Sequence, residues 1–257
     1  MKFLLGLLLL SGFILSAAPS VSAQDEDLDK LSFEETPLVD QESPYFVIGG
    51  GFIATWHFSN FDEIHKNTRL DNFASADMKA PVFLSGGAGF VAIPYLPNFR
   101  VGVFAAAGGK QVSATSSDTI RTLNYSLGYT GGSIDYAVQV TKKLTILPGL
   151  NIGGGTITIE TGQTVGKRDY TTELGTPTNT NNFYGKMTGG FAFVQPNLNI
   201  EYSVTSVSLL RINAGYMLGF MGAWRADRAE TEIVNVPKEI NSNGLTFQVG
   251  LFLGLFN

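Results

Sequence analysis

The stretch NIEYSVTSVSLLRINAGY, residues 199–216, decides the fold, because it carries Glu201 and Arg211 inside two otherwise apolar runs. Read with a period of two, each run alternates apolar and polar side chains, which is typical of a strand whose two faces meet different environments. If the two runs form a hairpin centred on Ser206, the numbers of opposite residues sum to 412, so that Glu201 faces Arg211. The same register pairs Asn199 with Asn213 on the polar face and Ile200 with Ile212 on the apolar face.

The same alternation divides the chain from Tyr45 onward into eight strand-like segments. They lie at residues 45–58, 80–94, 98–110, 121–140 and 144–160, in two runs between 191 and 224, and at 243–257. The connections "PYLPN", "TKK" and "TSVS" are short enough for hairpins, and they alternate with four long connections. All long loops then lie at one end of the strands and both termini at the other. The sequence therefore predicts an all-β, eight-stranded, antiparallel up-and-down sheet in one domain.

Residues 1–23 have the pattern of a secretory signal peptide. Lys2 precedes an apolar stretch, and small residues lead to a cleavage site after Ala23. An anchoring helix is the alternative, but it needs about 20 consecutive apolar residues, and this run breaks at Pro19. The chain has no cysteine, so it carries neither a disulfide framework nor a lipidation site.

Residues 24–44 form an acidic leader, in which eight acids stand against one basic residue, Lys30. A block of like charges with few aromatic residues buries too little apolar surface to become ordered. We expect a disordered periplasmic tail, with a docking motif for a partner as the alternative. The rest of the chain has no basic stripe interleaved with aromatic residues, which argues against nucleic acid as a partner.

An even number of antiparallel strands, with short turns at one end and long polar loops at the other, is typical of bacterial outer-membrane barrels. Over residues 45–257 the sequence resembles the porin-family small eight-stranded outer-membrane barrels of the OmpA and OmpX kind. The likeness rests on topology, face pattern and the alternating strand from Leu245 to Leu255, although the chain ends on Asn257 where that family typically ends on an aromatic residue. It implies a transmembrane β-barrel in the outer membrane of a Gram-negative cell envelope. The partners it implies are outer-membrane lipids and the outer-membrane assembly machinery.

A barrel in lipid pairs all its backbone groups within the sheet, turns apolar side chains outward and allows a polar interior. Glu201 and Arg211 then point inward, and the same parity adds Arg100 and Asp135 from two other segments. We expect these four residues to form a neutral cluster in the barrel interior, because pairing offsets part of the cost of burying each charge. Side chains fill the interior of an eight-stranded barrel, which favours a structural plug over a gate or ion path.

In the segments 121–140 and 144–160 the apolar parity switches partway, at Gly131–Gly132 and at Gly153–Gly155. These glycines lie opposite each other if that hairpin is centred on Lys142. Facing β-bulges are one interpretation. The other is that the upper part of the hairpin has left the membrane, where the apolar parity no longer matters.

Two further expectations concern the faces of particular strands. Trp56 and Trp224 fall near the loop-side ends of their strands with lipid-facing parity, as members of an aromatic belt. Parity also places four larger apolar residues inside the barrel: Phe83, Val91, Phe104 and Met217.

The motif His57-x-Ser59 resembles the His-x-Ser of the outer-membrane lipid A deacylases, in which the serine attacks and the histidine acts as base. Here it lies on the first strand, whereas that family carries it in its C-terminal half, and the nearby Asp62 and Glu63 lie in a loop. An ordinary strand end is therefore the favoured interpretation. A metal site is weaker still, because no ligand spacing is characteristic among His57, His65, Asp62 and Asp71.

Three function classes remain. The favoured one is a structural or surface-interaction protein that presents long extracellular loops to an extracellular ligand or surface and is not an enzyme. The alternatives are a narrow channel for ions or small apolar solutes and, less favoured, a lipid A-modifying hydrolase. No cofactor is expected, because none of the glycine-rich runs leads into a helical pattern that would hold a phosphate.

Overall fold

The computed structural model describes residues 47–64, 81–166, 182–226 and 231–256. The predicted signal peptide at 1–23 and the acidic leader at 24–44 lie outside the described residues. In the part of the chain that the structure describes, no helix is long and apolar enough to cross a membrane.

Strands make up most of the described residues, and their pairing is antiparallel throughout. The strands are β1 (Val47–Ser59), β2 (Val82–Ala92), β3 (Phe99–Ser116), β4 (Thr119–Tyr136), β5 (Val138–Gln139), β6 (Leu144–Val165), β7 (Phe183–Thr205), β8 (Ser208–Ala226), β9 (Glu232–Ile233) and β10 (Gly244–Phe256).

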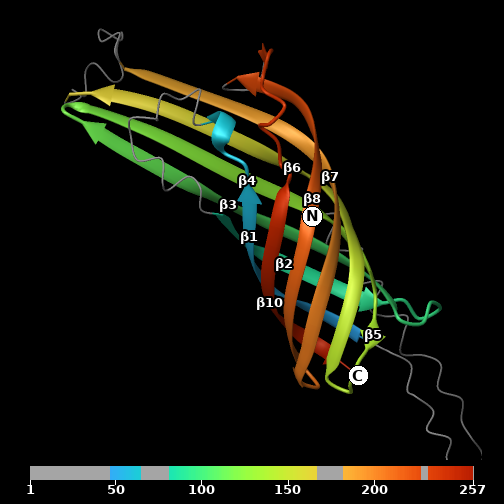
Figure 1. The fold of residues 1–257 in the computed structure, drawn as a ribbon. Helices are drawn as coiled ribbons and strands as arrows, with labels where there is room; N and C mark the ends of the chain where they lie inside the picture. The colour runs from blue at the N-terminus through green and yellow to red at the C-terminus, as the bar shows by residue number, and fades with distance from the viewer. Residues whose placement is uncertain (1–46, 65–80, 167–181, 227–230, 257) are drawn as a thin grey trace, which may run out of the picture. The chain divides into compact units, whose positions relative to one another are not determined.

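The eight longer strands form a closed ring (Figure 1). Each pairs with the next in chain order, and β10 pairs with both β1 and β8. The two short strands, β5 and β9, only extend the pairing at the edges of β6 and β8. Because the closed ring leaves no sheet edge, its backbone groups can all be paired inside the sheet. The predicted eight-stranded antiparallel up-and-down barrel is confirmed.

The outer face of this ring is apolar over much of its height. Exposed side chains on β10 include Leu245, Leu251 and Leu253, and β1 adds Phe52. A closed barrel that turns its apolar side chains outward is solvated by lipid, and single-chain barrels of this kind reside in the bacterial outer membrane. The transmembrane fold and the localisation in the bacterial outer membrane therefore agree with the structure.

The register of two hairpins follows the sequence prediction. In the β7–β8 hairpin Glu201 pairs with Arg211, as the sum of 412 requires. In the β4–β6 hairpin Gly131 pairs with Gly153, as expected for a hairpin centred on Lys142. Both predictions of register are confirmed.

The connection between β3 and β4 is not the long loop that the sequence predicted. The two strands continue upward until Ser116 pairs with Thr119, which leaves a two-residue turn. Ser117 has a φ of 53°, in the positive range that a tight hairpin turn needs at its first central position. The long connections are therefore three rather than four. Although this segment is rich in Ser and Thr, it forms two strands because its residues on β3 pair with residues on β4 up to the turn.

The outer and inner faces of β4 and β6 exchange their chemistry partway up, while the register runs unbroken from Thr119 to Asp135. Near the bottom, Ile134 is half exposed and Asp135 is buried. Higher up, the same inward parity carries Leu127 and Ile157, both buried, while the outward Thr130 is exposed. The prediction of facing bulges is wrong. The alternative agrees with the structure, because an outward face of threonines belongs in water.

The same inversion extends across neighbouring strands, where β3, β4, β6 and β7 continue beyond the ends of β1 and β10 (Figure 1). We call this part the upper sheet. Its inner face is an apolar core of side chains that are almost fully buried: Leu123, Tyr125, Leu127, Tyr129, Ile157, Ile159, Phe191 and Phe193. Phe61, which follows β1, packs edge-on against Tyr125 at 5.0 Å between ring centroids.

The two faces of β2 are reversed relative to the prediction. Phe83 and Val91 are exposed on the outer face, whereas Val82 and Leu84 are fully buried. The cause is pairing with β1, since Phe83 lies opposite the outward Trp56. The rings of Phe83 and Trp56 meet at 5.6 Å. The predicted inward positions of Phe104 and Met217 agree with the structure, since Met217 is fully buried and Phe104 packs against the core.

The predicted place of Trp224 in the lipid-facing belt is wrong, since only 5% of the residue is exposed. A β-bulge lies between the pairs Gly189–Trp224 and Phe191–Met221, where β8 has one extra residue. The extra residue shifts the parity and turns Trp224 to the buried side. Gly189 makes room there, because a Cβ at that position would lie 2.7 Å from the indole ring.

The inversion can be tested with two arginines placed on the outward face of β6. Leu150→Arg lies in the apolar band and should lower the free energy of unfolding by about 2–4 kcal/mol, whereas Thr156→Arg lies above it and should cost less than about 1 kcal/mol. Urea unfolding in lipid vesicles would measure both. Equal costs would contradict the change of environment between these positions.

Candidate functional site

The four charged residues predicted to meet in the interior come from four different strands. Arg100 lies near the start of β3 and Asp135 near the end of β4, while Glu201 and Arg211 are opposite each other on β7 and β8. The strands turn these positions inward because their neighbours, such as Val101, carry the apolar face that meets lipid. All four residues are buried, and Arg100 is 0% exposed.

The four side chains form a continuous chain of ion pairs. The Nε of Arg100 donates to Oδ2 of Asp135 at 2.9 Å, and its Nη1 lies 2.7 Å from Oε1 of Glu201. The Nε of Arg211 donates to the same Oε1 at 2.6 Å. Two acids and two bases therefore balance, and Glu201 stands between two guanidinium groups. The geometry brings all four residues together in one network.

Aromatic rings enclose both arginines, a feature that the sequence analysis missed. The Cζ of Arg100 lies 4.4 Å from the centroid of the Phe90 ring, and that of Arg211 lies 4.3 Å from the same ring. The Phe252 ring is 4.2 Å from Arg211. Such cation–π contacts favour a guanidinium in a place that water does not reach. These contacts were missed because the sequence did not show which face of β2 points inward. Phe83 was predicted to lie inside, whereas in the structure Phe83 faces outward and Phe90, which has the opposite parity, faces inward.

A layer of amides continues the network on β7 and β8. The Nδ2 of Asn199 donates to Oδ1 of Asp135 at 3.1 Å, and the Nδ2 of Asn213 donates to Oδ1 of Asn199 at 2.7 Å. Further up the interior, Gln195 donates to Thr246 at 2.5 Å. Most buried polar groups in proteins have hydrogen-bond partners; here Asn199 supplies one for the carboxylate of Asp135, and Asn213 supplies one for Asn199.

The residues considered for catalysis do not form a catalytic set. His57 and Ser59 both have inward parity on β1, and His57 is fully buried. Among the described residues, no hydrogen bond or ion pair joins His57 to a carboxylate. His65 and Asp71, considered as metal ligands, lie outside the described residues. Within the described ranges, no group of three or more His, Cys, Asp or Glu residues could hold a metal ion.

Removing Glu201 should be more destabilising than removing Arg211. Glu201→Leu leaves Arg211 buried without a carboxylate, a type of change that costs about 3–5 kcal/mol. Arg211→Met should cost less, because Glu201 keeps Arg100. The double variant should be more stable than Glu201→Leu alone, because the stranded charge is gone. Urea unfolding in detergent would measure the cycle, and additive costs would mean that the two side chains do not interact.

No family model matches the chain, and no curated protein matches it in sequence. Several solved structures resemble its fold. Ail, the attachment invasion locus protein of Yersinia pestis in complex with the heparin analogue sucrose octasulfate, is 6% identical, with a TM-score of 0.38 and coverage of 82% of this chain and 99% of that one. A major outer membrane protein from Thermus thermophilus is 7% identical, with a TM-score of 0.45 over 81% of this chain and 100% of that one. Acinetobacter baumannii CarO is 8% identical, with a TM-score of 0.31 over 79% and 96%. The likeness concerns the fold alone, and the fold assignment rests on the strand pairing and faces described above.

Proposed function

We propose that this chain is a closed outer-membrane barrel that acts as a structural and surface-interaction protein, not as an enzyme. Its outer face contacts outer-membrane lipids, and the outer-membrane assembly machinery inserts it. The upper sheet and the three long loops present a surface to a ligand outside the cell. The observation that carries this proposal is the inversion of the two faces in β4, β6 and their neighbours.

The inversion supports a rigid extracellular platform. In the upper sheet the apolar side chains point inward, where Leu127 and Ile157 are buried, and polar side chains such as Thr156 point outward. Such a sheet is stable in water because its apolar side chains pack against one another on the inner face and are removed from solvent. One outward contact on it is the ion pair between Glu160 and Lys186, whose Nζ and Oε1 atoms lie 2.9 Å apart. A hydrogen bond from Lys186 lowers the pKa of Glu160, so this pair remains ionised at neutral pH.

The charged cluster supports a plug rather than a channel. Beside it lies a cavity of about 20 Å³, lined by Asp135, Asn199 and Arg211 among others. A cavity of this size has room for about one water molecule. Above the cluster, Phe104 packs among the rings of Tyr129 and Phe193 at 6.1 and 6.3 Å between centroids. These contacts support a plug over a path for ions or small apolar solutes.

Shortening the β3–β4 hairpin tests the platform. Replacing residues 113–122 with Asn-Gly joins the paired Val112 and Leu123 by a two-residue turn and leaves the barrel intact. Cells that carry the wild-type protein should attach to one another or to glass more than cells without it, and the shortened protein should lose most of that gain. Attachment counts at equal surface expression would measure the effect.

A change at the other end of the barrel supplies the control. Lys142→Gln lies in the exposed turn between β5 and β6, and it should leave attachment unchanged. The purified wild-type protein should give no steady current in planar bilayers. Currents that change with Arg211→Met, together with attachment that does not depend on the hairpin, would replace this proposal with the narrow channel.

A further inference from the structure

A pocket of about 300 Å³ lies against the inner face of the upper sheet, near the upper ends of β6 and β7. Two register pairs form its wall on the sheet side, Ile159 with Met187 and Thr161 with Gly185. These positions share the inward parity of Ile159, which is buried in the apolar core. The pocket therefore lies on the opposite side of the sheet from the outward face of threonines.

Three isoleucines from other segments form the opposite wall of the pocket. Ile64 follows β1, Ile233 belongs to β9, and Ile240 lies between β9 and β10. Ile64 and Ile240 are almost fully buried, although they border an open space. Walls of this kind offer water few hydrogen bonds, so an apolar molecule can replace the water at little cost.

The space in the pocket exists because Gly185 has no side chain. A Cβ at this position would lie 3.4 Å from Oγ1 of Thr161, which is an ordinary contact, so a larger side chain would extend into the pocket. Gly185 is exposed, and the pocket is open to water on this side. On the lower side, Ile159 belongs to the buried core of the upper sheet. The pocket can therefore hold a molecule without leading into the barrel.

The size of the pocket and its one polar side chain on the inner wall define the ligand. An apolar cavity of about 150 Å³ takes up benzene, so a pocket of about 300 Å³ has room for about twelve non-hydrogen atoms. Thr161 places a hydroxyl on the wall, and its register partners, Leu123 and Gly185, have no side-chain group that could bond to it. This hydroxyl can bind one polar group of a ligand.

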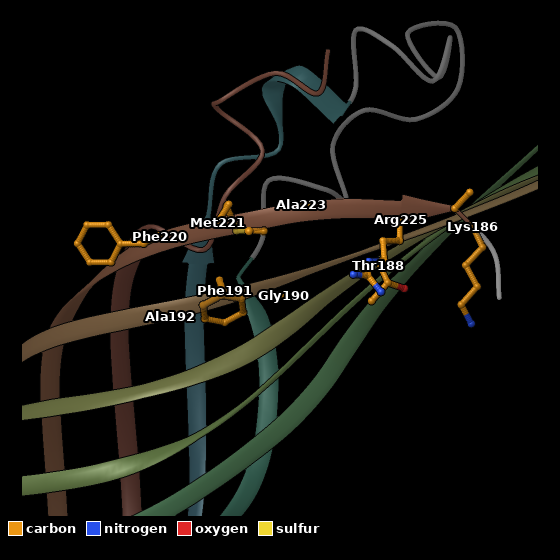
Figure 2. Close-up of a pocket in the computed structure, with 11 residues that line it drawn as sticks. Lys186, Thr188, Gly190, Phe191, Ala192, Phe220, Met221, Ala223 and Arg225 are labelled. Carbon is orange, nitrogen blue, oxygen red and sulfur yellow. The ribbon is translucent and has the colours of Figure 1, made fainter. Parts of the chain in front are cut away.

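The pocket favours a neutral ligand over an anion. Among the described residues that border it, the charged one is Lys186, whose Nζ lies 2.9 Å from Oε1 of Glu160. Figure 2 shows Lys186 beyond Phe191 along β7, the strand that forms part of the wall. A carboxylate in the pocket would lose its hydration without a cation of its own, which costs more than burying a neutral group.

We propose that this pocket binds a small, neutral, apolar molecule with one hydrogen-bonding group, such as a medium-chain alcohol, from outside the cell. Its hydrocarbon part lies between Ile159 and the isoleucines of the opposite wall, and its hydroxyl bonds to Oγ1 of Thr161. The proposal goes beyond surface interaction, because it concerns the inner face of the upper sheet. The two proposals can fail separately, since none of the described residues that line the pocket belongs to the β3–β4 hairpin.

Methyl NMR of the full chain in lipid nanodiscs tests this proposal. The isoleucine methyl groups are isotope-labelled, and the probe is 1-decanol. It should shift, in a saturable way, the signals of the isoleucines that line the pocket: Ile64, Ile159, Ile233 and Ile240. Ile200 and Ile212 are exposed on the lipid-facing side and report alcohol that has only dissolved in the bilayer. Decanoate, compared at the same free concentration in water, should bind about tenfold more weakly because its charge must be desolvated.

Three variants show whether the ligand occupies the pocket. Thr161→Val keeps the shape of the side chain and removes the hydroxyl, so it should weaken 1-decanol binding about fivefold, the ratio that one neutral hydrogen bond supplies. Gly185→Leu should abolish binding, because its side chain takes the place of the ligand. Gly128→Leu is the matched control, since Gly128 is the partner of the outward Thr156 and a Cβ there would make only ordinary contacts. Heat-dependent gel mobility confirms that each variant is folded.

The expected result is a set of saturable shifts that Gly185→Leu removes and Gly128→Leu keeps. Shifts confined to Ile200 and Ile212 would show alcohol dissolved in the bilayer and would overturn the proposal. Three further results would also overturn it: decanoate binding as tightly as 1-decanol, unchanged affinity in Thr161→Val, and an equal loss of binding in Gly128→Leu and Gly185→Leu.

Discussion

The structure depends on one continuous hydrogen-bonded ladder that β10 closes by pairing with β1 on one side and β8 on the other. In lipid every backbone group of such a ladder must be paired, so no strand can slip or leave the ring. Side chains therefore alternate between two faces along each strand, except where the bulge in β8 reverses the parity before Trp224. On β4 and β6 only the chemistry of each face changes with height. In this chain the change comes near Gly131 and Gly153, with the register intact.

The charged cluster follows from the same constraint. Inward positions in the apolar band cannot be solvated by lipid, and a barrel of eight strands is too narrow for much water. Arg100 and Arg211 are held by carboxylates and by the ring of Phe90, so that their charges are balanced without solvent. Higher up, where water meets the outer face, the interior becomes an ordinary apolar core. The polar plug and the upper sheet are thus two responses to one change of solvent.

Much of this arrangement could be predicted from the sequence wherever the two faces of a strand differ. The β7–β8 register could be predicted because Glu201 and Arg211 are charged residues inside apolar runs. Arg100 and Asp135 could be assigned to the interior for the same reason. On β2 both faces are apolar, so Phe83 and Phe90 could not be told apart without the pairing partner. Trp224 was misplaced because a bulge of one residue reverses parity and leaves no mark in the sequence. The β3–β4 extension was missed because a strand in water can carry the polar residues of a loop.

The central claim is that one face of β6 passes from lipid to water while its register continues. The chain has no cysteine, so single cysteines with nitroxide labels can be placed at the outward positions 150, 152, 154, 156 and 158 in bilayers. Collision rates with oxygen, which concentrates in lipid, and with a water-soluble nickel chelate would report the environment of each label. The account predicts that oxygen dominates at 150 and 152 and nickel at 156 and 158, with the crossing near Gly154. Oxygen dominance through residue 158 would contradict it.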